Sequence, residues 1–159
     1  MQDEIKVKEF KGKPDVFVAS RKGIVQVTTS EHLKNANKSL EQILRETCEA
    51  ARVFANEIFD NYSYPDGKWY PCGSADVVLK WNEHRSIINL FKEEGTENQR
   101  DFWKGWFGRL FKTSGQGWWW MPKLDKSSQS MLYEEEVCRF VRQKLALANI
   151  RVDVRSYID

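Results

Sequence analysis

The chain has 159 residues, of which 41% are hydrophobic and 30% are charged, and its net charge is +2. A chain of this length buries enough surface to build a core without disulfides, and the composition excludes a disordered protein. No apolar run approaches the length of a membrane span, and the small net charge alone indicates no class of partner.

The cysteines and histidines argue against a structural metal site. There are three cysteines and two histidines, far apart and without CxxC spacing, which is too few soft ligands for structural zinc. Cys48 and Cys138 fall on apolar stripes of expected helices, so we expect both to be reduced and buried. Residues 1–13 are polar and hold no apolar run of the kind found in a signal peptide, so we expect a cytoplasmic protein without membrane contact.

The N-terminal part of the chain predicts a small sheet. Residues 1–13 are charged and suit a loose or edge-pairing start. Two β-branched runs, 16–20 and 24–29, are joined through a short segment that ends in Gly23. This pattern is typical of a tight hairpin in which the glycine adopts a positive φ.

Residues 39–61 predict a long amphipathic helix. Ser39 and Gln42 have the spacing of a capping box, in which each side chain binds the free backbone N–H of the other. Apolar residues then recur at spacings of three and four, which indicates one continuous stripe. The stripe consists of Leu40, Ile43, Leu44, Cys48, Ala51, Phe54, Ile58 and Phe59.

A strand over residues 74–81 and a helix over residues 85–94 are expected next. The inward face of the strand would carry Ala75, Val77, Leu79 and Trp81. The inward face of the helix would carry Ile87, Ile88, Leu90 and Phe91, and Gly95 would end it.

Residues 102–111 favour a helix, because their aromatic and apolar residues recur at helical spacing. Gly105 and Gly108 weaken this prediction, since each costs roughly 1 kcal/mol inside a helix. The alternative is a hairpin in which residues 106–111 pair with 118–121. Residues 118–121, bounded by Gly117 and Pro122, predict a strand with aromatic side chains on both faces.

The C-terminal part predicts a helix over 133–148 and a strand over 150–158. The helix would turn Val137, Cys138, Val141, Leu145 and Ala148 inward. The strand would turn Ile150, Val152, Val154 and Ile158 inward. The whole chain, residues 1–159, is therefore expected to form one α+β domain, with a mixed or antiparallel sheet and helices packed on one side.

All seven tryptophans lie between Trp69 and Trp120, and residues 98–124 hold five basic residues against one acidic residue. Such rings fill a core or form a stacking surface, and Trp81, Phe102 and Trp106 fit a core. In the strand over residues 118–121, either Trp119 or both Trp118 and Trp120 face away from the core, unless both faces of the sheet are covered. Rings beside cations suit a nucleotide or a single-stranded nucleic acid. The expected ligand-binding residues are Trp103, Lys104, Arg109, Lys112, Trp119 and Lys123.

Three other interpretations remain open. An exposed aromatic patch suits a protein partner equally well, because tryptophan and arginine dominate interface hot spots. Cys72 could act as a nucleophile with His84 as base and Asp76 as orienting group, although a thiol in a turn is more often inert. The acidic residues 134–136 could bind a divalent ion, but they also fit the positive end of a helix.

Four short motifs carry a resemblance to a known group of proteins. They are Tyr70-Pro71-Cys72-Gly73, Gly117-Trp118, Gln129-Ser130 and Arg155-Ser156-Tyr157-Ile158-Asp159. Over residues 48–159 the chain resembles a group of small, uncharacterised phage and prophage proteins. The resemblance implies a viral accessory protein that acts in the host cytoplasm, and it transfers no catalytic residues.

These observations favour a non-enzymatic phage accessory protein that holds a nucleotide or nucleic acid on a surface of tryptophan, lysine and arginine. No cofactor and no metal are expected. The alternatives are a phage protein that inhibits a host defence protein and a thiol-dependent enzyme using Cys72.

Overall fold

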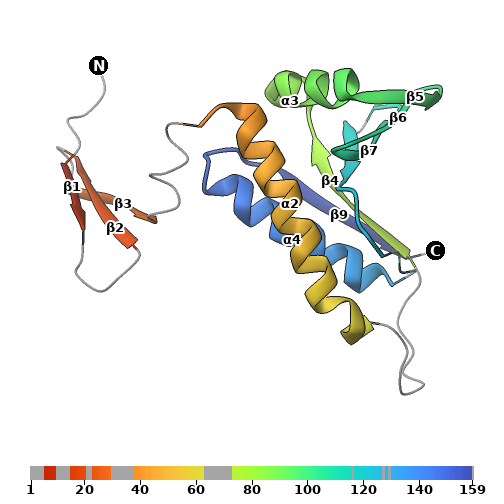
Figure 1. Cartoon of the computed structure of the whole chain (residues 1–159). Coiled ribbons are helices and arrows are strands. Elements are labelled where there is room, and N and C mark those ends of the chain that lie inside the picture. The colour runs from red at the N-terminus through yellow and green to blue at the C-terminus, as the bar shows by residue number, and fades with distance from the viewer. Residues whose placement is uncertain are drawn as a thin grey trace. The chain divides into compact units, whose positions relative to one another are not determined.

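The computed structural model describes residues 6–9, 15–20, 23–29, 38–62, 73–115, 117–126, 128 and 130–158. These residues fall into two compact units, Met1–Ser39 and Leu40–Asp159 (Figure 1). The α+β domain expected from the sequence is seen in the second unit, and its extension over residues 1–159 remains a prediction.

The first unit is a three-stranded antiparallel sheet of β1 (Lys6–Glu9), β2 (Asp15–Ser20) and β3 (Gly23–Thr29), in that order. Strands β2 and β3 pair from Asp15 opposite Thr29 to Ser20 opposite Gly23, so the predicted hairpin is confirmed. Strand β1 pairs with the other edge of β2, which confirms the edge-pairing start. Residues 21 and 22, which connect the hairpin, lie outside the described part of the chain.

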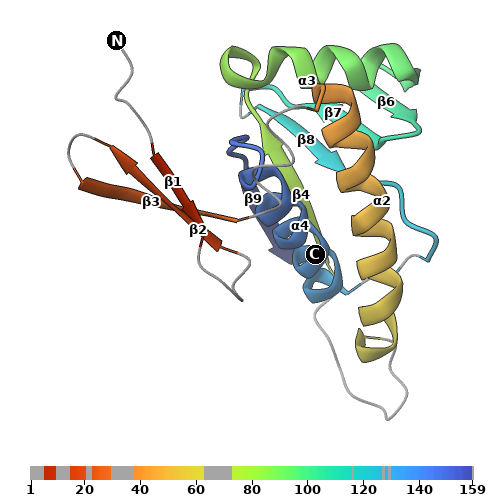
Figure 2. The same cartoon turned by 60° about the vertical axis from the view of Figure 1, so that its left-hand side comes forward.

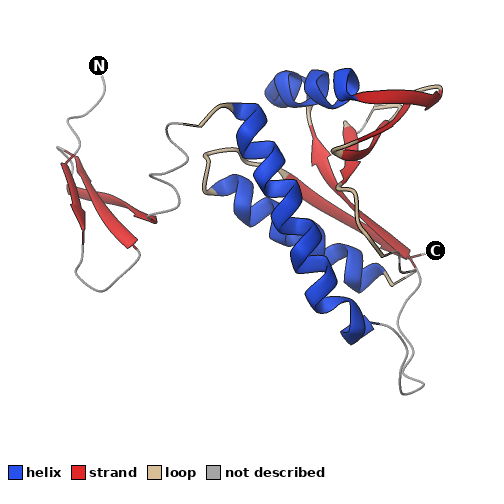
Figure 3. Ribbon diagram, viewed as in Figure 1, coloured by secondary structure: helices blue, strands red, loops and turns tan. Residues whose placement is uncertain are grey.

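The second unit combines helices with a six-stranded sheet (Figure 3). Its helical elements are α2 (Leu40–Ile58), the 3-10 turn η1 (Phe59–Tyr62), α3 (Trp81–Glu94) and α4 (Met131–Ala146). Its strands are β4 (Gly73–Leu79), β5 (Gly95–Gln99), β6 (Phe102–Gly105), β7 (Gly108–Lys112), β8 (Trp118–Met121) and β9 (Asp153–Ile158). The sheet order is β5-β6-β7-β8-β4-β9, and every neighbouring pair is antiparallel.

The helices pack on one face of this sheet, as Figure 2 shows for α2, α3 and α4. Ala75, Val77 and Leu79 project from β4 into the core and are fully buried, because alternate residues of a strand share a face. Leu110 of β7 and Trp120 of β8 extend the same face, since their partners in the register are also buried. The helices meet it with residues that include Leu44, Ile88, Val137, Val141 and Leu145.

Helices α2 and α4 begin close to the predicted residues. The buried stripe of α2 includes Leu44, Cys48 and Ala51, as expected from the spacing of three and four. Helix α4 begins at Met131 because the Ser130 hydroxyl accepts a hydrogen bond from the Tyr133 backbone N–H and caps the helix. None of the described helices is both long enough and apolar enough to cross a membrane.

The helix predicted over residues 102–111 is wrong. These residues form the hairpin of β6 and β7, which turns at Trp106 and Phe107, and the alternative pairing of β7 with β8 is confirmed. Gly108 favours the hairpin over the helix. Its φ is +107°, and an added Cβ would lie 2.0 Å from the Met121 carbonyl oxygen. A helix allows neither this backbone conformation nor such a close approach of two strands.

Three aromatic or apolar residues are less buried than expected. Trp81 begins α3 instead of ending the preceding strand and is 42% exposed. Trp106 is 44% exposed because it lies at the hairpin turn. Ile158 is 65% exposed, since its partner in the register is Gly73, which has no side chain to pack against.

Candidate functional site

An aromatic row crosses the sheet face that the helices leave open. Phe102 in β6 lies opposite Phe111 in β7, and Phe111 lies opposite Trp119 in β8. The ring centroids are 6.2 Å apart in the first pair and 6.1 Å apart in the second. Trp118 and Trp120 point the other way and are buried, whereas Phe111 is 38% exposed and Trp119 is half-buried. The row thus presents ring surface across three strands.

A row of positive charge runs parallel to the aromatic row. Lys104 lies opposite Arg109, and each is two residues along its strand from Phe102 or Phe111. A separation of two residues keeps side chains on one face and sets their Cα atoms about 6.6 Å apart. The Lys104 ammonium lies 5.6 Å from the centroid of the Phe102 ring. Phe102 was expected to be a core residue, and this is wrong because it belongs to the open face.

Trp119 is held by residues of the edge strand β9. The guanidinium carbon of Arg155 lies 3.5 Å from the centroid of the Trp119 ring and 4.4 Å from that of Tyr157. The Trp119 and Tyr157 rings are 6.3 Å apart. The Arg155 Nη1 atom is buried and has no hydrogen-bond partner among the described residues. Arg155 therefore orients the indole through its planar cation and keeps an unused donor beside it.

Two carboxylates and Arg109 form a polar cluster beside these rows. The Nη2 atom of Arg109 is 3.3 Å from Glu134 of α4 and 4.0 Å from Asp76 of β4. Burial raises the pKa of both carboxyl groups, and Arg109 partly offsets this effect. Glu134 also accepts a 3.4 Å hydrogen bond from the backbone N–H of Ala75. Strand β8 pairs with β4 only at Val77, Val78 and Leu79. The start of β4 is therefore not covered by β8, and the Glu134 carboxylate can reach the Ala75 amide.

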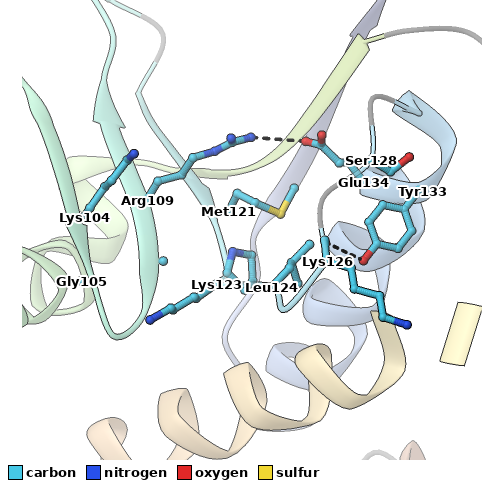
Figure 4. Close-up of a pocket in the computed structure, with 12 residues that line it drawn as sticks. Lys104, Gly105, Arg109, Met121, Lys123, Leu124, Lys126, Ser128, Tyr133 and Glu134 are labelled. Carbon is cyan, nitrogen blue, oxygen red and sulfur yellow. Dashed lines mark hydrogen bonds and ion pairs between the residues drawn. The ribbon is translucent and has the colours of Figure 1, made fainter. Parts of the chain in front are cut away.

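Two adjoining pockets open beside this cluster and share Lys104 and Arg109. The pocket on the sheet face has a volume of about 350 Å³. It is lined by Ser74, Asp76, Phe102, Lys104, Arg109, Phe111, Trp119 and Tyr157. The second pocket, of about 490 Å³, lies between the β6–β7 hairpin, the segment after β8 and the first turn of α4 (Figure 4).

The structure divides the expected ligand-binding residues among three places. Trp119, Lys104 and Arg109 share the open sheet face, and Lys123 lines the second pocket. Trp103 and Lys112 lie on the opposite face, where both adjoin the ring of Trp118. The expected basic residues therefore do not form one patch. Three of the six expected ligand-binding residues lie together on the open sheet face.

The opposite face carries a second cluster of indoles and cations. Trp118 lies between Trp103 and Trp81, with centroid distances of 5.5 Å and 6.1 Å. Lys92 lies over Trp103 at 5.0 Å, and Arg85 lies over Trp81 at 5.1 Å. Trp118 is buried here, so Trp81 provides the exposed indole of this cluster.

The residues expected to bind a ligand did not include Arg155, Tyr157, Phe111 or Asp76. The alternation of residues in β9 predicts that Arg155 and Tyr157 lie on its outward face. Their position beside Trp119 could not be predicted, because it depends on β4 lying between β8 and β9. Such pairing joins segments far apart in sequence.

The thiol and metal hypotheses gain no support from the described residues. The Nδ1 atom of His84 accepts from the Lys80 backbone N–H, and its Nε2 atom lies 2.8 Å from the Arg151 carbonyl. Both ring nitrogens are thus engaged by the backbone, and His84 is not free to act as a base. Cys72 lies outside the described residues. No group of three potential metal ligands occurs in the described part of the chain.

Comparisons of the chain with protein-family models, with curated proteins and with solved structures return no match. The function must therefore be inferred from the chemistry of the site.

Proposed function

We propose that the open face of the sheet binds single-stranded nucleic acid. Bases stack on the row of Phe102, Phe111 and Trp119, and phosphates contact the neighbouring row of Lys104 and Arg109. The observation that carries this proposal is the register, which sets one row of rings beside one row of cations. The viral accessory role implied by the sequence resemblance forms part of the same proposal.

The chemistry of the two rows suits a strand of any sequence. Every base has a π-face, and stacking on an aromatic side chain contributes about 1–3 kcal/mol per base. Other antiparallel sheets with exposed rings stack two or three bases in this way, and three strands carry rings here. Lysine and arginine neutralise phosphate without reading sequence.

We expect double-stranded nucleic acid to be a poorer ligand for this face. A flat row of rings stacks with bases only when they are unpaired and splayed from a helix. The pocket of about 350 Å³ on this face is lined by Trp119 and has the size of a small-molecule site. We therefore expect single strands to bind more tightly than duplexes of the same sequence.

Binding of a fluorescently labelled single strand, followed by anisotropy, tests the proposal. Trp119→Ala should weaken binding about tenfold or more, because it removes the largest ring of the row. Trp81→Ala is the matched control, since Trp81 is an exposed tryptophan outside this face. Affinity that is undetectable for the wild type, or that falls with Trp81→Ala and not with Trp119→Ala, overturns the proposal.

Salt provides a second measurement on the same complex. Each phosphate contact lowers the logarithm of the affinity by about 0.7 per tenfold rise in salt for single strands. Lys104→Ala should therefore reduce the slope by about that amount without abolishing binding. A slope unchanged by this substitution would exclude Lys104 from the phosphate row.

The second candidate is a surface for a host protein, and the exposed part of the opposite cluster favours it. Trp81 is 42% exposed, stacks on Trp118 and carries Arg85 over its ring. Tryptophan and arginine on such a rigid base are typical of interface hot spots. A stoichiometric partner captured from host lysate by the wild type and lost with Trp81→Ala would support this role. Capture that persists with Trp81→Ala would exclude it.

A further inference from the structure

The second pocket lies at the end of the charged row. The β6–β7 hairpin forms one wall, the first turn of α4 forms the far wall, and Met121 and Leu124 form the floor between them (Figure 4). Pro122 also lines the pocket. Met121 and Pro122 are buried and Leu124 is half-buried, so the floor is apolar and firmly packed. Lys104 and Arg109 line both this pocket and the pocket on the sheet face, so the two pockets adjoin at these residues.

The charge of this pocket is strongly positive. Lys104, Lys123 and Lys126 all line it, and Asp125 lies close enough to Lys126 to interact with its charge. Its one carboxylate, Glu134, is engaged by Arg109 at 3.3 Å. Lys126 lies at the rim, with its ammonium 5.1 Å from the centroid of the Phe59 ring. Three lysines and Arg109 bring positive charge to the lining of one open pocket, and such a cluster attracts an anion of more than one charge.

The long lysine side chains give the pocket its positive charge, while buried side chains and backbone determine its shape. Tyr133 is fully buried, and its hydroxyl donates to the Lys126 carbonyl at 3.4 Å, which ties the loop before α4 to the helix. Gly105 and Gly108 add no side chains to the hairpin wall, which leaves room between Lys104 and Arg109 and the rest of the pocket. The volume of about 490 Å³ has the size of a small-molecule site and not of a channel.

We propose that this pocket receives the phosphorylated end of the strand whose bases stack on the open sheet face. The ligand group is a terminal phosphomonoester, which carries about −1.5 to −2 charges near pH 7, whereas an internal phosphodiester carries one. The inference rests on the proposed function, because Lys104 and Arg109 connect the pocket to the aromatic row. A strand with a phosphate at its end gains the lysines of the pocket in addition to the rings.

The experiment compares one labelled oligonucleotide in three forms: 5′-phosphate, 3′-phosphate and hydroxyl at both ends. With the full chain we expect one phosphorylated form to bind about tenfold more tightly than the hydroxyl form, the gain of one charge-assisted contact. In Lys123→Ala/Lys126→Ala this ratio should fall to about one. The control Arg142→Ala/Lys144→Ala removes the same charge from the other end of α4 and should retain the ratio.

The outcomes separate the two proposals. Equal affinity of all three forms for the wild type overturns the terminal-phosphate pocket and leaves the sheet-face proposal in place. Loss of the ratio in both the pocket variant and the control variant also overturns it, because general charge would then explain the preference. Binding by no form of the strand removes both proposals together.

Glu134→Gln provides an independent variant in which the pocket stays intact. The amide oxygen can still accept from Ala75, while the negative charge beside Arg109 is removed. We expect the preference for the phosphorylated form to rise about threefold or more. Lowering the pH from 7.5 to 5.5 should reduce the preference, since a phosphomonoester dianion takes up a proton near pH 6 and becomes a monoanion. A preference that is insensitive to both changes contradicts recognition of a dianion.

Discussion

The guanidinium carbon of Arg155 lies 3.5 Å from the centroid of the Trp119 ring, although 35 residues separate the two along the chain. The contact bridges β8 and β9, which both pair with β4 and do not pair with each other. It therefore joins the aromatic row to the edge of the sheet, and the free energy of unfolding should depend on it.

Arg155→Lys should lower the free energy of unfolding by about 1 kcal/mol. Lysine keeps the charge but loses the planar group that lies flat on the ring, and cation–π contacts contribute about 0.5–2 kcal/mol according to burial. Chemical denaturation measures the change. Arg151→Lys is the matched control, because Arg151 is exposed and should change stability by less than about 0.5 kcal/mol. Equal effects of the two substitutions would show that the ring contact contributes nothing.

Asp76→Asn should make the protein more stable at neutral pH and leave it unchanged at low pH. Burial raises the pKa of Asp76, while Arg109 and Arg155 partly lower it. A raised carboxyl pKa means that stability is fully present below the unfolded pKa of about 3.9 and is lost as the pH rises through the folded pKa. The asparagine variant does not lose this stability, so the difference in Tm should grow from pH 3.5 to pH 7.

The control for this prediction is Asp153→Asn, which removes an exposed carboxylate that pairs with Lys80 at 3.6 Å. Its Tm difference should change little with pH, because exposed pairs contribute little. Asp76 also faces Glu134, and a neutral residue at 76 relieves their repulsion. If Asp76→Asn were less stable than the wild type at pH 7, attraction to Arg109 would outweigh the burial of the charge.

The helices and the outer strand were predictable because their patterns are local. The stripe of α2 needs only spacings of three and four, and β9 needs only alternation. Residues 102–111 were not predictable from spacing, because 102, 103, 106, 107, 110 and 111 fit a helix as well as two strands around a two-residue turn. The alternation of β8 did indicate that Trp119 faces away from its neighbours. The row it forms with Phe102 and Phe111 depends on long-range register, which no local pattern contains.

Trp120→Phe should cost about 2–4 kcal/mol of stability. Trp120 is fully buried, and its indole N–H donates to the Phe107 carbonyl at 2.7 Å. Phenylalanine leaves that carbonyl without its donor and leaves a cavity in the core. Denaturant unfolding with the matched variant Trp106→Phe, at an exposed position, measures the difference. Similar losses at the two positions would contradict the burial of Trp120.

The thiols of Cys48 and Cys138 should be unreactive in the native protein. Burial raises the pKa of Cys48 to about 12 and raises that of Cys138 well above its usual value. The thiolate, which is the reactive form, is therefore scarce at pH 8. In Cys72→Ser, a thiol reagent should label these two cysteines only as the protein unfolds. Fast labelling of the native variant would show that one of them is open to solvent.

Gly108→Ala and Gly115→Ala separate backbone strain from steric exclusion, because both glycines have a positive φ. At Gly108 an added Cβ would meet the Met121 carbonyl oxygen at 2.0 Å, whereas at Gly115 nothing lies within 4 Å. Gly115→Ala should therefore lose only the strain of its conformation, about 1–3 kcal/mol. Gly108→Ala must also separate β7 from β8, which displaces the partners of the aromatic row. We expect it to lose more stability than Gly115→Ala and to lose single-strand binding as well. Equal stability losses with binding retained in both variants would mean that the close contact of β7 and β8 at Gly108 is not required by the site.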